Sequence, residues 1–203
     1  MGLLTAGHCE NRVSPYTDAD VLGTGYWQWN NRWIELYAPT LEFNVVYVRG
    51  GTGDKYDFQF HPMPVWTIYT EVHIGNNEYV RVVSVEDSRL VGPGDLYCKY
   101  GISSGYKCGT IRDANFFWSG DQSYGYWRWR GLNNDAFSTA GGDSGGAVFT
   151  QPDFGTVIAA AMQVGQVDIV ETVNGVSRTF RDSVQMPIDY VDDRYPVVLA
   201  TQR

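Results

Sequence analysis

Short strand-like runs, separated at close intervals by turn-forming residues, constrain the fold of this chain most strongly. Residues 43–48, 79–85 and 156–162 are rich in β-branched and aromatic side chains, which favour β-strands. Breaks rich in glycine and asparagine interrupt the pattern at residues 50–53, 75–77, 92–94 and 132–134. Many short strands with frequent turns predict an all-β sandwich or barrel. A short terminal helix is expected only at residues 189–195, between two prolines.

Length and charge limit the organisation and the partners. A chain of 203 residues forms one large domain or two small ones, and two strand-rich halves meet near residues 75–77. The formal net charge of −8 and the absence of a basic run disfavour nucleic-acid binding. No apolar run has the length of a membrane span, and the first residues do not have the pattern of a signal peptide.

Two aromatic segments leave two interpretations open. Residues 25–29 with Trp33, and residues 124–129, alternate tryptophan and tyrosine with other residues. Such rings can form a stacking platform for sugars or single-stranded nucleic acid. They can equally pack one face of a β-strand, which is the interpretation that aromatic strand preference favours.

The cysteines also leave alternatives. The count of three is odd, so at least one thiol lacks a partner within the chain. Cys98 and Cys108 bracket a short glycine-containing loop, and a disulfide there would stabilise the fold by roughly 2–3 kcal/mol. The rival is a pair of buried thiols in a reducing compartment.

The segment Gly-Gly-Asp-Ser-Gly-Gly at residues 141–146 carries the clearest chemical signal. Glycines around Ser144 permit a tight turn that exposes the hydroxyl and brings backbone N–H groups close to a substrate. A neutral serine needs a general base, and Thr-Ala-Gly-His-Cys at residues 5–9 supplies His8. Taken alone, each segment would pass for an ordinary glycine-rich turn or a structural histidine.

Together, the two segments are the paired signature that the chymotrypsin-like serine proteases carry, in the same order. Residues 97–111 resemble the short disulfide loop of the streptogrisin and α-lytic protease branch, and residues 183–188 are similar to its closing segment. The resemblance implies a Cys98–Cys108 disulfide. It also implies two antiparallel six-stranded Greek-key barrels, here at residues 1–75 with His8 and at residues 76–203 with Ser144.

The resemblance implies a catalytic triad, of which the acid is the least obvious member. Asp57 precedes an alternating apolar run, as the family's acid does, and follows His8 by 49 residues (57 − 8). Asp54 is the nearest rival, but a glycine-rich turn precedes it. The expected triad is His8, Asp57 and Ser144, with the backbone N–H groups of Gly142 and Ser144 as the oxyanion hole.

Two further expectations come from the resemblance. Asp143 is expected to form a buried ion pair with Lys99, although a solvated Lys99 on the surface is the alternative. The substrate pocket is expected at Ser138, Thr139, Gln163 and Gly165. Because Ser138 carries no charge, a trypsin-like preference is disfavoured, and an apolar or aromatic P1 residue is expected instead. The three histidines show no ligand spacing with carboxylates, so no metal and no cofactor are expected.

Only three residues separate Met1 from Thr5, whereas the family has further strands before its histidine motif. The resemblance therefore implies a first barrel that is incomplete, and a partner strand missing for Cys9. The expected function is a secreted, monomeric serine endopeptidase that acts on polypeptides. The alternative is a catalytically inactive protease fold that serves as a binding module.

Overall fold

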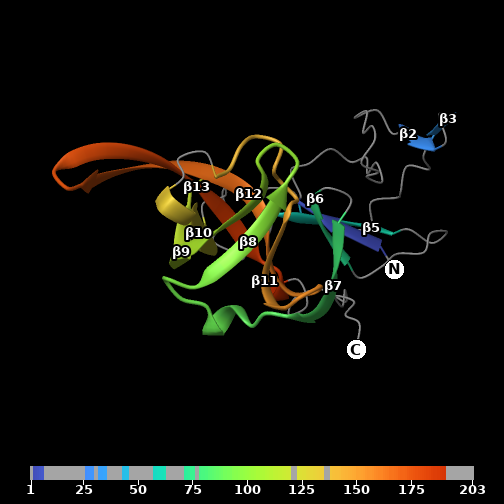
Figure 1. Cartoon of the computed structure of the whole chain (residues 1–203), viewed down its shortest axis with the longest axis horizontal. Coiled ribbons are helices and arrows are strands. Elements are labelled where there is room, and N and C mark those ends of the chain that lie inside the picture. Colours follow the sequence, from blue (N-terminus) through green and yellow to red (C-terminus); the bar gives the residue numbers. More distant parts are fainter. Residues whose placement is uncertain are drawn as a thin grey trace.

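The computed structural model describes residues 2–6, 26–29, 32–35, 43–45, 57–62, 71–75, 78–119, 123–134 and 138–190. Figure 1 shows that most of these residues are in β-strands. The strands of the largest sheet are β6 (Glu71–Gly75), β7 (Glu78–Val85), β8 (Leu96–Gly101), β9 (Gly105–Trp118), β10 (Ser123–Gly131), β11 (Ala147–Asp153), β12 (Thr156–Val173) and β13 (Val176–Pro187). The remaining elements are β1 (Gly2–Thr5), β2 (Tyr26–Trp29), β3 (Arg32–Glu35), β4 (Phe43–Val45), β5 (Phe58–Pro62) and the 3-10 turns η1 (Ser88–Leu90) and η2 (Leu132–Asn134).

Six strands of the large sheet close on themselves. The strand order is β11-β8-β9-β10-β13-β12, and β12 also pairs with β11. Every pairing in this ring is antiparallel. Closure removes the free edges that an open sheet would expose. Strand β7 joins β12 in parallel, and β6 pairs with β7 as the outermost strand.

The N-terminal half contributes smaller sheets within its described residues. Strands β1, β5 and β4 form a three-stranded antiparallel sheet, and β2 pairs with β3 as a hairpin. Ala6, directly after β1, is fully buried in an apolar cluster with Val164 of β12. This contact joins the end of β1 to the closed barrel.

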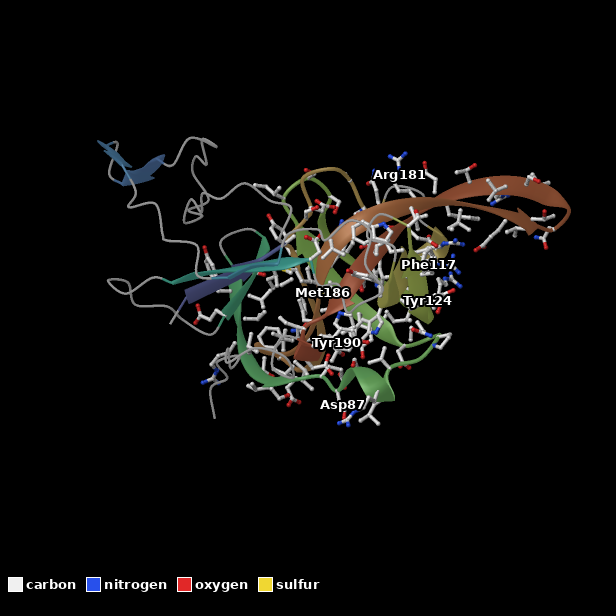
Figure 2. The ribbon with its side chains drawn as sticks, turned by 180° about the vertical axis from the view of Figure 1, so that it is seen from behind. Asp87, Phe117, Tyr124, Arg181, Met186 and Tyr190 are labelled. Carbon is white, nitrogen blue, oxygen red and sulfur yellow. A yellow bond between two sulfur atoms is a disulfide. The ribbon has the colours of Figure 1, made fainter. Side chains whose placement is uncertain are left out.

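Tryptophans fill the barrel. Trp127 and Trp129 of β10 are fully buried, and they pack with Tyr97, Ile111 and other apolar residues of the barrel strands. Tyr126, on the other face of β10, packs edge-on against Trp118 of β9. Tyr126, Trp127 and Trp129 therefore follow the packing interpretation, whereas Tyr124 of the same segment is exposed. Met186 lies in the interior, and the Phe117 and Tyr124 rings lie together at the surface (Figure 2).

Strands β12 and β13 continue beyond the barrel as a long two-stranded hairpin, which projects from the rest of the molecule in Figure 1. Its turn is Asn174-Gly175, with φ of 52° and 78°. Positive φ at both residues is what a two-residue hairpin turn requires. Arg181 lies on the outer side of this hairpin (Figure 2) and forms an ion pair with Asp168 on the opposite strand.

The base of the hairpin is fixed by a cluster of charges. The Arg130 guanidinium donates to Asp182 at 2.6 and 2.9 Å and to Glu171 at 2.7 and 2.9 Å. It also lies over the Phe180 ring, 3.9 Å from its centroid. Arg128 donates to Asp182 at 2.9 Å. These contacts tie β10 of the barrel to both strands of the hairpin.

The all-β fold expected from the sequence is confirmed, and the closed six-stranded ring agrees with the expected barrel. Residues 156–162 form part of a strand that is much longer than the apolar run. The expected boundary between residues 75 and 76 falls between β6 and β7 and stays a prediction. The chain becomes helical at Asp189 and Tyr190, and the rest of the expected terminal helix lies outside the described residues.

Candidate active site

The Ser144 segment forms a compact turn between η2 and β11. The amide of Gly146 donates to the Asp143 carbonyl at 2.9 Å, and the amide of Asp143 donates to the Ala140 carbonyl at 3.2 Å. Gly142 has a φ of +95°, in the region that favours glycine. A Cβ atom at Gly142 would lie 2.6 Å from the Ser103 hydroxyl. Both the turn and the close approach therefore require glycine at this position.

The side chain of Asp143 holds the Ser144 turn in place through several hydrogen bonds. Its carboxylate accepts hydrogen bonds from the backbone amides of Ser103, Ser104 and Ala140, each at 3.0 Å. The Lys99 ammonium lies 2.9 Å from the carboxylate and also donates to the Ser104 hydroxyl at 2.9 Å. Asp143 is 1% exposed and Lys99 is 0% exposed. The ion pair expected from the resemblance is thus present, and it is fully buried.

The surroundings of the pair act on both pKa values. Burial alone would raise the pKa of Asp143, but hydrogen bonds from Ser104 and Lys99 and the charge of Lys99 hold it below its usual range. Burial lowers the pKa of Lys99, while the hydrogen bond and charge of Asp143 oppose that change. A charge-assisted hydrogen bond between two buried groups therefore fixes the loop that carries Ser144.

The segments of the other two candidate residues lie beside each other, because β1 pairs with β5. Asp57, 2% exposed, directly precedes β5. Antiparallel pairing of β1 with β5 places Thr5 opposite Gln59, so the chain leading to His8 begins beside the strand that Asp57 precedes. His8 itself and Cys9 lie outside the described residues. The packing of Ala6 against Val164 links this region to β12.

Strand β12 lies directly beside the Ser144 turn. The amide of Gly145 donates to the Gln163 carbonyl at 2.8 Å, and the amide of Gln163 donates to the Gly146 carbonyl at 2.9 Å. The Gln163 side chain donates to the Thr139 hydroxyl. Ser138, fully buried, accepts from the Gly131 amide at 3.2 Å. Three of the four expected pocket residues thus lie together, and Gly165 follows on β12, where it packs against Trp118.

The structure adds residues that the sequence analysis did not identify. Ser103 and Ser104, whose amides bind Asp143, lie in the loop closed by the Cys98–Cys108 disulfide, which links β8 to β9. In the sequence, the feature that could have pointed to them is the pair of adjacent serines at the tip of that loop. Ser183 and Gln185 of β13 lie opposite β12, and no local pattern marks them.

Metal-binding groups and membrane-spanning helices would indicate other functions. No group of three or more histidine, cysteine, aspartate or glutamate side chains within them is arranged to hold a metal ion. No helix among them has the length and apolar character needed to cross a membrane.

Comparison of the whole chain with solved structures identifies its fold. No protein-family profile and no curated protein matches the sequence. A glutamic acid-specific serine protease that uses a histidine triad in substrate binding is similar in structure. It has a TM-score of 0.61 and 18% identity over 97% of this chain and 85% of that one.

Two further proteases give nearly the same result. Thermobifida fusca protease A has a TM-score of 0.60 and 19% identity, over 99% of this chain and 85% of its own. Cellulomonas bogoriensis chymotrypsin has a TM-score of 0.59 and 17% identity, over 99% of this chain and 86% of its own. The chain therefore has the chymotrypsin-like fold, which confirms the fold implied by the two sequence motifs.

Proposed function

We propose that this chain is a serine endopeptidase in which Ser144 is the nucleophile, His8 the general base and Asp57 the residue that orients His8. The buried Asp143–Lys99 pair beneath the Ser144 turn is the observation that carries the proposal. Burying an ion pair costs desolvation free energy. Its presence under a glycine-rich turn therefore favours the interpretation that the pair holds this turn in one particular conformation. The chymotrypsin-like fold supplies the setting in which such a turn serves acyl transfer.

In the proposed reaction the Ser144 Oγ attacks the carbonyl carbon of the scissile peptide while its proton passes to His8. The tetrahedral intermediate collapses, the carbon–nitrogen bond breaks, and His8 gives the proton to the leaving amine. Water then attacks the acyl-enzyme ester while His8 accepts a proton from it. The ester carbon–oxygen bond breaks, His8 returns the proton to the Ser144 Oγ, and the acid product leaves. Asp57 holds the His8 tautomer and stabilises the imidazolium.

The oxyanion would be held by the backbone N–H groups of Gly142 and Ser144. The positive φ of Gly142 supports this assignment, because it turns the peptide plane away from the direction that an ordinary residue would give it. The contacts of Asp143 with Ala140 and Lys99 hold this part of the loop in place. Pre-organised donors of this kind supply much of the rate enhancement in acyl transfer.

A fluorophosphonate probe tests the proposal on the intact chain, because it labels only a serine that has a working base and oxyanion hole. We expect one label on Ser144, found by peptide mass spectrometry, and no label on Ser144→Ala or His8→Ala. Asp57→Asn should label far more slowly, since it favours the wrong His8 tautomer. An unlabelled but folded wild-type chain would refute the enzyme and favour the binding module.

We also propose that the enzyme is secreted and acts on polypeptides. The disulfide between Cys98 and Cys108 supports an oxidising compartment, since cytosolic thiols are normally kept reduced. Digestion of an unfolded protein, with the products sequenced, would test the substrate class. Cleavage at internal peptide bonds supports an endopeptidase, whereas removal of single terminal residues contradicts it.

A further inference from the structure

A cluster of buried polar side chains lies next to the Ser144 turn. Its members are uncharged, and each is at most 2% exposed: Ser138, Thr139, Gln163, Ser183 and Gln185. The Gln163 carbonyl accepts a hydrogen bond from the Gly145 amide, and the Gln163 amide donates to the Gly146 carbonyl, which places the cluster beside the proposed nucleophile. In antiparallel pairing, Gln163 lies directly opposite Gln185, so their side chains share one face of the sheet.

Several polar atoms of this cluster lack hydrogen-bond partners among the described residues. They are Gln163 Oε1, Ser183 Oγ, Gln185 Nε2 and Gln185 Oε1. Native proteins leave few buried polar groups unpaired, because each one loses its hydration without compensation. Four such atoms, on three positions of two paired strands, leave hydrogen-bonding capacity that a water molecule or a polar group of a ligand would fill.

We propose that this cluster is the P1 specificity site of the enzyme and that it binds a side-chain carboxamide, that of glutamine or asparagine, N-terminal to the cleaved bond. This inference rests on the proposed serine peptidase function and names its substrate class. A primary amide offers two donors and one acceptor, which match the free acceptors and donors of Gln163, Ser183 and Gln185. A glutamine amide can present either its oxygen or its nitrogen, so the match holds in both orientations.

Other side chains fit the cluster less well. An apolar P1 residue would leave all four atoms unpaired. A carboxylate or ammonium group would be buried beside neutral dipoles only. The buried charges next to the cluster in sequence already have partners, because Asp143 is paired with Lys99, and Asp182 with Arg130. The proposal therefore replaces the apolar P1 residue expected from the sequence.

Peptide substrates that differ only at P1 test the proposal directly. With the wild-type chain we expect kcat/KM for P1 glutamine or asparagine to exceed that for phenylalanine, leucine, glutamate and lysine by about tenfold to hundredfold. A preference for any of those four residues, or no discrimination, would overturn the inference.

Two substitutions test whether Gln163 and Gln185 bind the P1 side chain. Gln163→Met and Gln185→Met keep the side-chain length but remove the amide. We expect each to lower kcat/KM for the glutamine substrate at least tenfold and to raise it for a methionine substrate. Gln151→Met, an exposed position on β11, is the matched control and should change neither value.

Thermal unfolding separates specificity from a structural role. Removing the Gln185 amide, neither atom of which has a partner among the described residues, should leave the melting temperature unchanged or raise it, whereas Gln163→Met also removes the hydrogen bond to Thr139 and should lower it slightly. A large fall in melting temperature, with equal losses for every P1 residue, would mean that the amides only support the fold, and would overturn the proposal. Fluorophosphonate labelling separates the two hypotheses: labelled Ser144 with an apolar P1 preference refutes this inference alone, whereas no labelling refutes both.

Discussion

Replacing Lys99 with methionine is the most informative test of how the Ser144 turn is held. Methionine keeps most of the volume of the side chain but removes the ammonium group that lies 2.9 Å from Asp143. The carboxylate of Asp143 would then keep three backbone donors and lose its only counter-charge among the described residues. The Ser104 hydroxyl would lose its donor as well.

The magnitude follows from the burial of both groups. Removing one partner of a buried ion pair typically costs about 3–5 kcal/mol, because the other charge stays in a medium of low polarity. Because Lys99 is 0% exposed and Asp143 is 1% exposed, we expect the whole of this loss in unfolding free energy. For a chain of this length, 1 kcal/mol shifts the melting temperature by about 2–4 °C, which predicts a fall of about 6–20 °C.

Chemical denaturation and peptidase assays on the wild type, on the single variants Lys99→Met and Asp143→Asn, on their double variant and on a control variant check this reasoning. Lys99→Met should lose about 3–5 kcal/mol of unfolding free energy and most of its kcat. Lys107→Met is the matched control, since Lys107 lies opposite Lys99 on β9 and is only half-buried. The double variant Lys99→Met/Asp143→Asn should recover part of the stability, because neither charge remains. A loss for Lys99→Met no larger than that of the control, or a double variant less stable than both single ones, would refute the account.

The pH dependence gives a second readout of the same pair. The pKa of Asp143 is lowered in the folded chain, so its ionisation stabilises the fold above the ordinary carboxyl pKa of about 4. That contribution is lost as the pH falls through the lowered value, and the wild type should therefore lose it only below about pH 4. In Lys99→Met the pKa of Asp143 should rise toward or above its value in the unfolded chain, so the loss of stability in acid should shrink and the difference from the wild type should narrow as the pH falls. Unfolding free energies between pH 2.5 and 7 measure the difference.

Three further predictions concern the turn, the disulfide and the hairpin. Gly142→Ala should lower kcat by about 10²–10³-fold by displacing one oxyanion donor, measured with the best peptide substrate. Substituting Cys98 and Cys108 by serine should cost roughly 2–3 kcal/mol of unfolding free energy in urea, and an unchanged value would contradict the disulfide. Arg130→Met should cost about 3 kcal/mol, because Asp182 would remain buried with Arg128 as its remaining partner. It should also speed amide hydrogen exchange in the β12–β13 hairpin.

The parts of the molecule that follow local rules were predictable from the sequence. Strands can be recognised by their β-branched residues, and turns by their glycine-rich breaks, because the preferences that form both depend on only a few neighbouring residues. The Ser144 turn was predictable for the same reason, since Gly142 serves a backbone requirement that is written in the local sequence. The Lys99–Asp143 pair, separated by 44 residues, was accessible only through resemblance to a family.

The features that the sequence did not reveal depend on strand register. Gln185 reads as an ordinary polar residue until β12–β13 pairing places it opposite Gln163. The same holds for Arg130 and Asp182, which are 52 residues apart. Nothing in a single sequence fixes which residues of two distant strands face each other, and a shift of one residue would move each side chain to the other face.

A single hairpin connects the stability of the barrel to the proposed chemistry. The Cys98–Cys108 disulfide holds β8 to β9 one residue before Lys99. The tip of the same hairpin supplies the amides of Ser103 and Ser104 that bind Asp143. Asp143 in turn fixes the peptide between Gly142 and Ser144. Because these constraints act in series, the geometry of the proposed oxyanion hole depends on a hairpin that touches no substrate in the proposed mechanism, and the rigidity of this hairpin would contribute to the proposed active site.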